Sequence, residues 1–489
     1  MFDEVLELVA ELVEDAARRV SGRIPHAADR RAVVPGRDLV QPLDVLRAAF
    51  AGNCRICAVQ VEGRSWAEIA CNMPVSEGLR VLTDSDVVKE YRKSILQLLT
   101  LNHPVDCGIC DKAGECKLQD YHYQYNGASS LSRDPKVRST KFHPLSERIV
   151  LDNERCILCS RCVRFTREIS KSNALGIVQR GDVSLVRAAE DHPLDSDPYS
   201  DNIIDLCPVG ALLSREFLYR ARVWYLKPTR SVCPGCARGC TIQIWHRKLE
   251  WKLNSLDPRM NARIERVTPL ENDEVNGPWI CNKGRDLTKI FERPRAEHSM
   301  QKGKPVELES AIETARRLVA TAKRPVALVS TWGSNEELDA FRRTLGARVE
   351  AWVKQDWAPQ PGERLDDDLL IRADKNPNTA TACALFLDRD DPAQALPEDV
   401  DLVIVWGEGF DFARVPRRAR IVFLNAYLQP ENGHADVFIP ISIQTERRGH
   451  YTNFEGVVSA FEPCFPKKPA VADAEALFAA LATPAKVRT

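Results

Sequence analysis

Apolar residues recur at helical spacing at the start of the chain but not in the long stretch that follows. Residues 2–17 predict an amphipathic helix, with Asp and Glu between the apolar positions. We favour packing of this helix on its own domain over docking to a partner subunit. From residue 50 to 230, Gly, Pro, Asn and Asp interrupt the pattern, and 89–101 and 161–170 predict short helices. This texture is typical of loop-rich domains.

Helices and strands alternate more regularly in the second half of the chain. Within residues 231–300, alternating apolar runs at 241–245 and 279–280 predict short strands of a compact module. After about residue 305 the pattern becomes strand and helix in turn, which predicts a βαβ arrangement. The expected helices are 309–322 and 336–345, and the expected strands are 326–330, 402–406 and 421–424.

Composition and charge exclude several classes of protein. With 68 Lys and Arg against 69 Asp and Glu, the net charge of −1 gives no reason to expect nucleic-acid or anionic-membrane binding. The chain has no run of 18 apolar residues, so no transmembrane helix is predicted. The N-terminal sequence contains Asp3, Glu4 and Glu7 and does not resemble a signal peptide. We therefore expect a cytosolic protein, in which clustered cysteines bind metals rather than form disulfides.

Cysteine is concentrated in one part of the chain, since 14 of the 16 lie between Cys54 and Cys281. The first complete group of ligands places one histidine before three cysteines. Three thiolates and an imidazole can hold either zinc or a four-iron cluster, and the spacing alone does not choose between them. This group consists of His103, Cys107, Cys110 and Cys116.

The second group predicts iron more sharply. Cys156, Cys159 and Cys162 form a Cys-x-x-Cys-x-x-Cys run, followed at a distance by Cys207 and Pro208. This is the binding pattern of a four-iron cluster in ferredoxin-type domains. If the Cys156 group binds iron, the neighbouring His103 group is also expected to bind iron rather than zinc.

A third set of four is formed by Cys233, Cys236, Cys240 and Cys281, for which zinc is the weaker alternative. The gap between Cys240 and Cys281 spans a hairpin-like stretch that can fold back on itself. We therefore expect the last cysteine to join the first three.

A fourth group is incomplete. Cys54, Cys57 and Cys71 have the loop spacing of a two-iron site of ferredoxin type, but no cysteine precedes Cys54 in this chain. Asp44 lies near the position of the missing thiolate, and a carboxylate can bind ferric iron. We favour a remnant without a cluster over a cluster completed by Asp44 or another group. Outside these four groups, Cys383 and Cys464 are expected to be ordinary thiols.

The order of these groups resembles that of the large, G-type iron–sulfur subunit of bacterial respiratory complex I, the NADH:quinone oxidoreductase. The resemblance runs from about residue 50 to the end. Family-like sequences occur at residues 51–57, 102–107, 282–285, 435–440 and 452–456. Two features depart from the family. Leu43 stands where its first two-iron cysteine is normally found, and 208 residues follow Cys281, which indicates a short form with a truncated molybdopterin-oxidoreductase-like domain.

The resemblance implies an α+β multidomain fold, with ferredoxin-like iron–sulfur domains in the N-terminal half and a small α/β molybdopterin-oxidoreductase-like domain after them. Residues 1–90 would form a divergent two-iron, β-grasp-type domain with the N-terminal helix. Residues 91–230 would carry the histidine-ligated and the all-cysteine four-iron sites. Residues 231–300 would be a four-iron module of molybdopterin-oxidoreductase type, and 301–489 the truncated α/β domain.

The function implied is electron relay, without bond chemistry in this chain. Three 4Fe-4S clusters are expected, with one 2Fe-2S cluster if the Cys54 group is complete, and neither molybdopterin nor flavin. The two central sites would lie on the main electron path and the Cys233 site off it. Partners would be a flavin- and NADH-binding subunit and quinone-side iron–sulfur subunits. The chain would be cytoplasmic, peripheral to the inner membrane, and held there only through its partners.

Three other functions compete with this interpretation. A diaphorase-type relay subunit of a NAD-linked hydrogenase or electron-bifurcating complex would share the clusters and differ in partners. A molybdenum-dependent formate dehydrogenase would need a metal-binding Cys or Ser in a glycine-rich site, which neither Cys383 nor Cys464 occupies. A structural zinc protein is the alternative without redox chemistry, and an absorbance spectrum would distinguish it.

Overall fold

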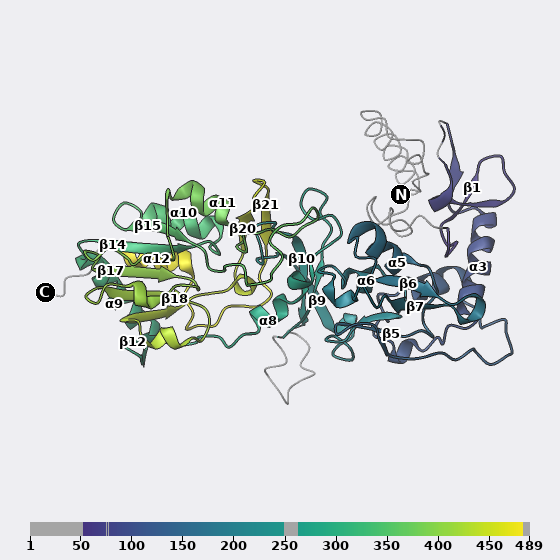
Figure 1. The fold of residues 1–489 in the computed structure, drawn as a ribbon, viewed down its shortest axis with the longest axis horizontal. Helices are drawn as coiled ribbons and strands as arrows, with labels where there is room; N and C mark the ends of the chain where they lie inside the picture. The colour runs from purple at the N-terminus through teal and green to yellow at the C-terminus, as the bar shows by residue number, and fades with distance from the viewer. Residues whose placement is uncertain (1–51, 75, 77, 249–262, 483–489) are drawn as a thin grey trace. The chain divides into compact units, whose positions relative to one another are not determined.

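The computed structural model describes residues 52–74, 76, 78–248 and 263–482. The predicted helix at 2–17 and Asp44 lie outside the described residues. The chain divides into two compact units, residues 1–224 and 225–489. The four-domain division expected from the sequence stays a prediction. Figure 1 shows both units, and each is described here by itself.

The described part of the N-terminal unit is built from short elements joined by long loops. Its strands form a three-stranded sheet in the order β2-β1-β3, another in the order β4-β5-β8, and the hairpin β6-β7. The strands are β1 (Ala58–Val61), β2 (Ala67–Ile69), β3 (Val81–Leu82), β4 (His143–Pro144), β5 (Ile149–Leu151), β6 (Leu175–Val178), β7 (Leu185–Ala188) and β8 (Leu212–Ser214). The α-helices are α3 (Asp86–Thr100), α4 (Lys117–Tyr121), α5 (Arg161–Arg164) and α6 (Asn202–Leu206).

The longest of these helices, α3, shows how sequence determines local structure here. Ser85 caps its N-terminus by accepting a hydrogen bond from the Val88 N–H at 3.3 Å. The helix buries one stripe that includes Leu96 and Arg92. The Arg92 guanidinium donates to the carbonyl of Ala58 at 2.9 Å, which ties the helix to β1. The predicted helix at 89–101 is thereby confirmed.

The C-terminal unit begins with a three-stranded antiparallel sheet in the order β11-β10-β9. It continues into an eight-stranded sheet in the order β13-β12-β19-β18-β17-β14-β15-β16, parallel from β19 to β16. The hairpin β20-β21 completes the unit. The first strands are β9 (Leu226–Val232), β10 (Thr241–Arg247), β11 (Ile264–Pro269), β12 (Ser299–Gln301) and β13 (Lys304–Val306). The later strands are β14 (Pro325–Ser330), β15 (Glu350–Lys354), β16 (Asp388–Arg389), β17 (Leu402–Trp406), β18 (Arg420–Asn425), β19 (Val437–Pro440), β20 (Gly449–Thr452) and β21 (Val458–Phe461).

Helices pack against one face of the eight-stranded sheet. The helices of this unit are α7 (Asn282–Arg285), α8 (Leu287–Phe291), α9 (Leu308–Thr321), α10 (Asn335–Thr344), α11 (Thr379–Leu385) and α12 (Ala474–Ala482). Because side chains alternate along a strand, Ala327 and Val329 of β14 pack against α9, α10 and α12. Val326 and Leu328 point to the opposite face, which loops such as the one bearing Phe410 close. The core of the unit therefore lies on both faces of the sheet.

Most elements expected from the hydrophobic pattern are present, and the α+β fold class is confirmed. The predicted strands at 241–245, 326–330, 402–406 and 421–424 and the helices at 161–170, 309–322 and 336–345 match within a few residues. In the first of these helices, α5 widens into a π-helical turn at Phe165–Ile169. No described helix is long and apolar enough to cross a membrane.

The predicted strand at 279–280 is wrong. Trp279 and Ile280 are buried, but their backbone is irregular, and the Trp279 N–H donates to the carbonyl of Asn276. The Asn276 side chain donates in turn to the carbonyl of Trp279 at 3.1 Å. A buried amide side chain therefore satisfies backbone groups that a neighbouring strand would otherwise bond.

Candidate metal centres

The histidine-containing group lies on the loop between α3 and α4. Cys107 opens a single 3₁₀ turn, and Cys116 directly precedes α4. Burial lowers the pKa of His103 to about 4, so the imidazole is neutral at pH 7. Its Nδ1 atom is buried and has no hydrogen-bond partner. A neutral imidazole with an unused buried nitrogen has the chemical form that binds a metal.

The thiols of this group are held away from water. Burial raises the pKa of Cys110 and raises that of Cys116 to about 11. A thiolate in such a place needs a compensating positive charge, which a bound metal supplies. The arrangement therefore suits a bound zinc ion or iron–sulfur cluster.

The second group is brought together by the start of α5 and the end of α6. Leu158 and Ser160 adopt left-handed backbone conformations, with φ of 52° and 59°, between the three clustered cysteines. These conformations turn the backbone sharply between the three cysteines. Burial, with the charge of Cys207 as a further cause, raises the pKa of Cys156 to about 12 and that of Cys159 to about 11. The four sulfurs are thus neighbours, as the spacing predicts.

The first two groups are in direct contact through the segment that follows Cys207. The Cys116 thiol lies 3.7 Å from the carbonyl oxygen of Pro208. A Cβ atom on Gly210 would lie 2.2 Å from the Sγ atom of Cys110, so this position has no room for a side chain. One four-residue segment therefore carries a ligand of the second group and lies against two ligands of the first.

The third group belongs to the C-terminal unit. Cys233 and Cys240 flank the turn between β9 and β10, where the Cys233 N–H donates to the carbonyl of Cys240 at 2.8 Å. Cys281 directly precedes α7, after the antiparallel strand β11 has brought the chain back. Burial raises the pKa of Cys233 and Cys240 well above the usual value and that of Cys281 to about 11. The hairpin that the sequence predicted is confirmed.

The incomplete group lies beside the second one. The Asn53 side chain donates to the hydroxyl of Ser160 at 2.8 Å, and the charge of Cys54 raises the pKa of Cys159. A hydrogen bond from Cys57 lowers the pKa of Cys71 to about 6, with further help from the Gly52 N–H and two arginines. The Cys54, Cys156 and His103 groups therefore follow one another in that order.

Within the described ranges, no three His, Cys, Asp or Glu side chains lie close enough together to hold a single metal ion. The four ligands of a four-iron cluster each bind a different iron, and so they stand farther apart than the ligands of one ion. The buried or half-buried thiols and the unpartnered imidazole nitrogen fit that larger group. His103, Cys107, Cys110 and Cys116, then Cys156, Cys159, Cys162 and Cys207, and finally Cys233, Cys236, Cys240 and Cys281 could each hold one cluster.

Three protein families match this chain, each over one complete ligand group. Residues 92–130 match the NADH-ubiquinone oxidoreductase-G iron–sulfur binding region, which contains the His103 group. Residues 146–213 match the ferredoxin-like domain of NADH-quinone oxidoreductase subunit 3, which contains the Cys156 group. Over these two regions the chain is similar to G-type subunits of NADH-quinone oxidoreductases. Residues 226–293 match the molybdopterin oxidoreductase Fe4S4 domain, around the Cys233 group.

Individual proteins are similar to this chain over the same part of the sequence. The chain is 35% identical over 299 residues to the G-type subunit of NADH-quinone oxidoreductase from Rickettsia typhi, covering 60% of this chain and 42% of that protein. It is also 35% identical over 305 residues to the alpha subunit of the NADPH-Fe(3+) oxidoreductase of Geobacter sulfurreducens, covering 61% and 34%. The chain thus spans about two fifths or less of the length of these relatives.

Among solved structures, the chain matches a crystal structure of NAD+-reducing [NiFe]-hydrogenase in the H2-reduced state. The match has a TM-score of 0.33 and 26% sequence identity, and it covers 40% of this chain and 87% of that one.

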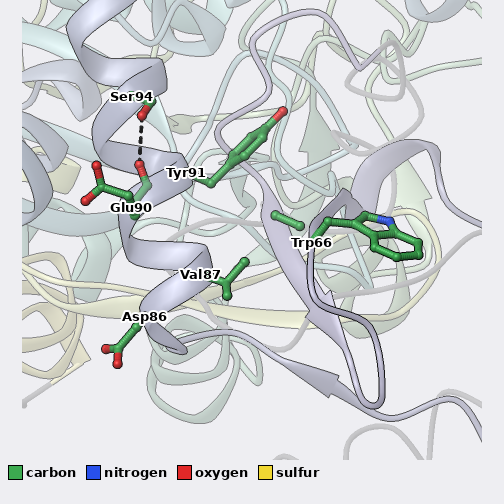
Figure 2. A pocket seen from close by; sticks show the side chains of 7 residues that line it. Trp66, Asp86, Val87, Glu90, Tyr91 and Ser94 are labelled. Atoms are coloured by element: carbon green, nitrogen blue, oxygen red, sulfur yellow. Dashed lines mark hydrogen bonds between the residues drawn. The ribbon is translucent and has the colours of Figure 1, made fainter.

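An open hollow of about 580 Å³ lies near the start of α3, apart from the ligand groups (Figure 2). Trp66 lies opposite Val87 and Tyr91, and the Ser94 hydroxyl donates to the carbonyl of Glu90 at 3.0 Å. The lining contains no cysteine or histidine, so it adds no candidate ligand to the four groups.

Another polar cluster occupies the carboxyl ends of the parallel strands, where open α/β sheets commonly bind ligands. Lys354 donates to Asp356 at 2.7 Å, and the Ser330 hydroxyl donates to the same carboxylate at 2.6 Å. A Cβ atom on Gly407 would lie 2.0 Å from an Asp356 oxygen. The protein's own ion pair therefore fills this place.

The sequence reasoning missed three residues that the structure brings to the ligand groups. Gly210 lies against Cys110, and the buried arginines Arg155 and Arg164 lie beside the His103 and Cys156 groups. Gly210 follows the Cys-Pro pair closely, and that proximity was a usable signal. The ligand spacing contains no information about where the two arginine side chains point.

Proposed function

We propose that this chain is an electron-relay subunit of an NADH:quinone oxidoreductase complex. Electrons would pass from a flavin- and NADH-binding partner toward quinone-side iron–sulfur subunits, with no bond chemistry in this chain. The observation that carries the proposal is the contact between the His103 and Cys156 groups through residues 207–210. Two redox groups held in such contact can exchange electrons without movement of the protein.

Each ligand group has a defined part in this proposal. Three four-iron clusters, when bound, each accept and return one electron. The cysteines supply thiolates from buried positions, and the loops around them exclude water. His103 supplies a neutral ligand in place of a thiolate, which reduces the negative charge of its site and favours the reduced state.

The order of neighbouring groups gives the relay a path. The Cys54 group adjoins the Cys156 group, which in turn contacts the His103 group. We propose that electrons arrive on the Cys54 side and leave from the His103 side. Cys54, Cys57 and Cys71 remain, in our preferred interpretation, a remnant without a two-iron cluster.

The C-terminal unit would contribute a scaffold. Its Cys233 group holds a four-iron cluster off the main path, and the eight-stranded sheet holds no molybdopterin. The internal Lys354–Asp356 pair at the strand ends supports this part of the proposal, because it fills the place that a ligand would take. Membrane association, at the cytoplasmic face, would come only from the partners, and no nucleic acid is involved.

A second candidate function is a relay subunit in a related assembly with a different electron donor or acceptor. The 35% identity to the alpha subunit of a NADPH-Fe(3+) oxidoreductase equals that to the NADH-quinone oxidoreductase protein of Rickettsia typhi. A diaphorase-type subunit of a NAD-linked hydrogenase belongs to the same class of alternatives. These candidates share the clusters and differ in the partners.

The test uses the assembly isolated anaerobically through a tag on this chain. NADH should produce the electron paramagnetic resonance signal of the His103-ligated cluster within milliseconds, as complex I-type turnover requires. Cys159→Ser should abolish that rapid reduction while dithionite still reduces the His103 site, and Cys464→Ser, a buried cysteine outside the groups, should change neither. Reduction by NADPH but not NADH would favour the second candidate, and no reduction by either would contradict electron relay.

A further inference from the structure

Arg155 occupies the junction between the His103 and Cys156 groups. Its backbone directly precedes Cys156, while its side chain, 1% exposed, extends toward the other group. The guanidinium donates two hydrogen bonds to Asp106, from Nε at 2.9 Å and from Nη2 at 2.6 Å. Asp106 itself directly precedes Cys107. The side chain is thus fixed next to the ligands of the histidine-containing site.

The remaining nitrogen of this guanidinium has no partner. Nη1 of Arg155 is buried and makes no hydrogen bond. The Cδ atom of Arg155 lies 3.6 Å from the point that a Gly210 Cβ would occupy, and the Cys110 sulfur lies 2.2 Å from the same point. A buried N–H donor without a partner destabilises the fold, so its retention beside a ligand sulfur indicates an acceptor that the bound cluster would supply.

We propose that Arg155 raises the reduction potential of the His103-ligated cluster, through its positive charge and through a hydrogen bond from Nη1 to a cluster sulfur. This inference rests on the proposed function, in particular on a four-iron cluster at the His103 site. Net charge and hydrogen bonds to sulfur are the two means by which proteins tune such clusters. The added electron is stabilised by a nearby cation in a region of low dielectric.

The charges around Arg155 give the effect its sign. Asp152, fully buried, lies 3.4 Å from Nε, and Lys141 shares Asp106, Asp152 and Glu154. If Arg155 is lost, Asp106 and Asp152 lose one of their two cationic partners and keep Lys141. The reduction potential of the cluster should then fall, because a cation is removed and because the negative charge of the carboxylates is compensated less fully. Removal of the Asp106 charge should have the opposite effect.

Arg164 provides a matched comparison. It is also buried, and its Nη1 atom also lacks a partner. Its Nη2 atom donates to the carbonyl of Cys159 at 3.4 Å, and its charge acts on Cys71. It therefore lies at the other junction, between the Cys156 and Cys54 groups. Replacing it should leave the His103-ligated cluster unaffected.

The experiment is a redox titration of the full, iron-loaded chain, followed by electron paramagnetic resonance. Arg155→Gln should lower the midpoint potential of the His103-ligated cluster by at least the equivalent of a tenfold change in its one-electron reduction constant, about 59 mV. Asp106→Asn should raise the same potential, and Arg155→Lys should show a smaller decrease than Arg155→Gln. Arg164→Gln should leave this potential unchanged, and the Cys156-ligated cluster should move less than its neighbour in Arg155→Gln.

The outcomes separate this inference from the proposed function. If the unmodified chain shows no His103-ligated cluster, the proposed function fails at this site. If the cluster is present and neither Arg155→Gln nor Asp106→Asn shifts its potential, the role of Arg155 is refuted. Shifts of the same sign in both variants would also refute it, because they would indicate structural disturbance. If Arg155→Gln does not assemble, the Asp106→Asn and Arg155→Lys titrations decide.

Discussion

The N-terminal unit and the eight-stranded sheet of the C-terminal unit differ in what stabilises their folds. Among the described residues, nine non-glycine residues of the N-terminal unit have positive φ angles, and one, Lys302, does so in the C-terminal unit. The strands of the N-terminal unit have two to four residues each. In contrast, every residue of β14 and β17 is buried in a continuous core.

This contrast indicates what the bound clusters contribute. A left-handed conformation at a residue such as Leu158 costs about 1–3 kcal/mol and persists only where the surroundings impose it. In the ligand loops, the bonds to iron can impose it. The sheet needs no such help, because apolar burial contributes about 25 cal/mol per Å². The N-terminal unit should therefore depend on iron for its fold, and the sheet should not.

The largest expected effect is that of removing iron. Anaerobic chelation should strip amide protection from α5 and β8 while β14, β17 and β18 stay protected, because metal binding and folding are coupled in the first region alone. Hydrogen exchange with mass spectrometry measures this directly. Equal loss of protection in both regions, or none in either, would break the comparison.

A smaller effect should follow from adding one methyl group between two ligand sets. Gly210→Ala would place a Cβ atom 2.2 Å from the Cys110 sulfur and should cost the His103-ligated cluster, about four irons per chain. Gly108→Ala, in the same ligand loop but with no atom within 4 Å of the new Cβ, is the matched control. Iron quantitation checks both. Full iron content in Gly210→Ala would show that the His103 and Cys156 groups can move apart without loss of a cluster.

The third prediction concerns the incomplete group. Because the pKa of Cys71 is lowered to about 6, its thiol is mostly ionised at pH 7, and its alkylation rate should rise through pH 6 and level off above it. Burial raises the pKa of Cys464 to about 12, so its rate should still be rising at pH 10. In the iron-loaded chain, peptide mapping after brief iodoacetamide treatment should therefore find Cys71 labelled first. Protection of Cys71 would instead indicate a two-iron cluster.

The smallest effect should come from the sheet unit alone. Ser334 caps α10 and forms a capping box with Glu337, so Ser334→Ala should lower the free energy of unfolding of this unit by about 1 kcal/mol. Thermal unfolding followed by circular dichroism measures the loss. Iron content should not change, and a coupled loss of iron would argue against the independence of the two regions.

The elements that periodicity predicts well are those whose own side chains form the core. The strand at 402–406 matches β17 residue for residue, because five apolar residues in a row are buried on both faces. Trp279 and Ile280 are equally apolar, but the Asn276 side chain holds their backbone, and no pattern of hydrophobicity reports that. A short apolar pair is therefore weak grounds for a strand.

The candidate sites show the same limit. Spacing predicts most members of each ligand group, because cysteines two or three residues apart can face one centre. Contacts between groups depend on residues distant in sequence, as with Cys116 and Pro208. The direction of the Arg155 side chain follows from Asp106, which lies 49 positions away. Such pairings arise from the tertiary fold, and a single sequence does not contain them in readable form.

The central claim is that three four-iron clusters make this chain an electron relay, and their count tests it most directly. Anaerobic purification of the full chain, followed by iron and acid-labile sulfide quantitation, should give about twelve of each per chain. The charge-transfer absorbance should bleach when dithionite is added. Fewer than about ten irons per chain, or stoichiometric zinc in their place, would contradict the account.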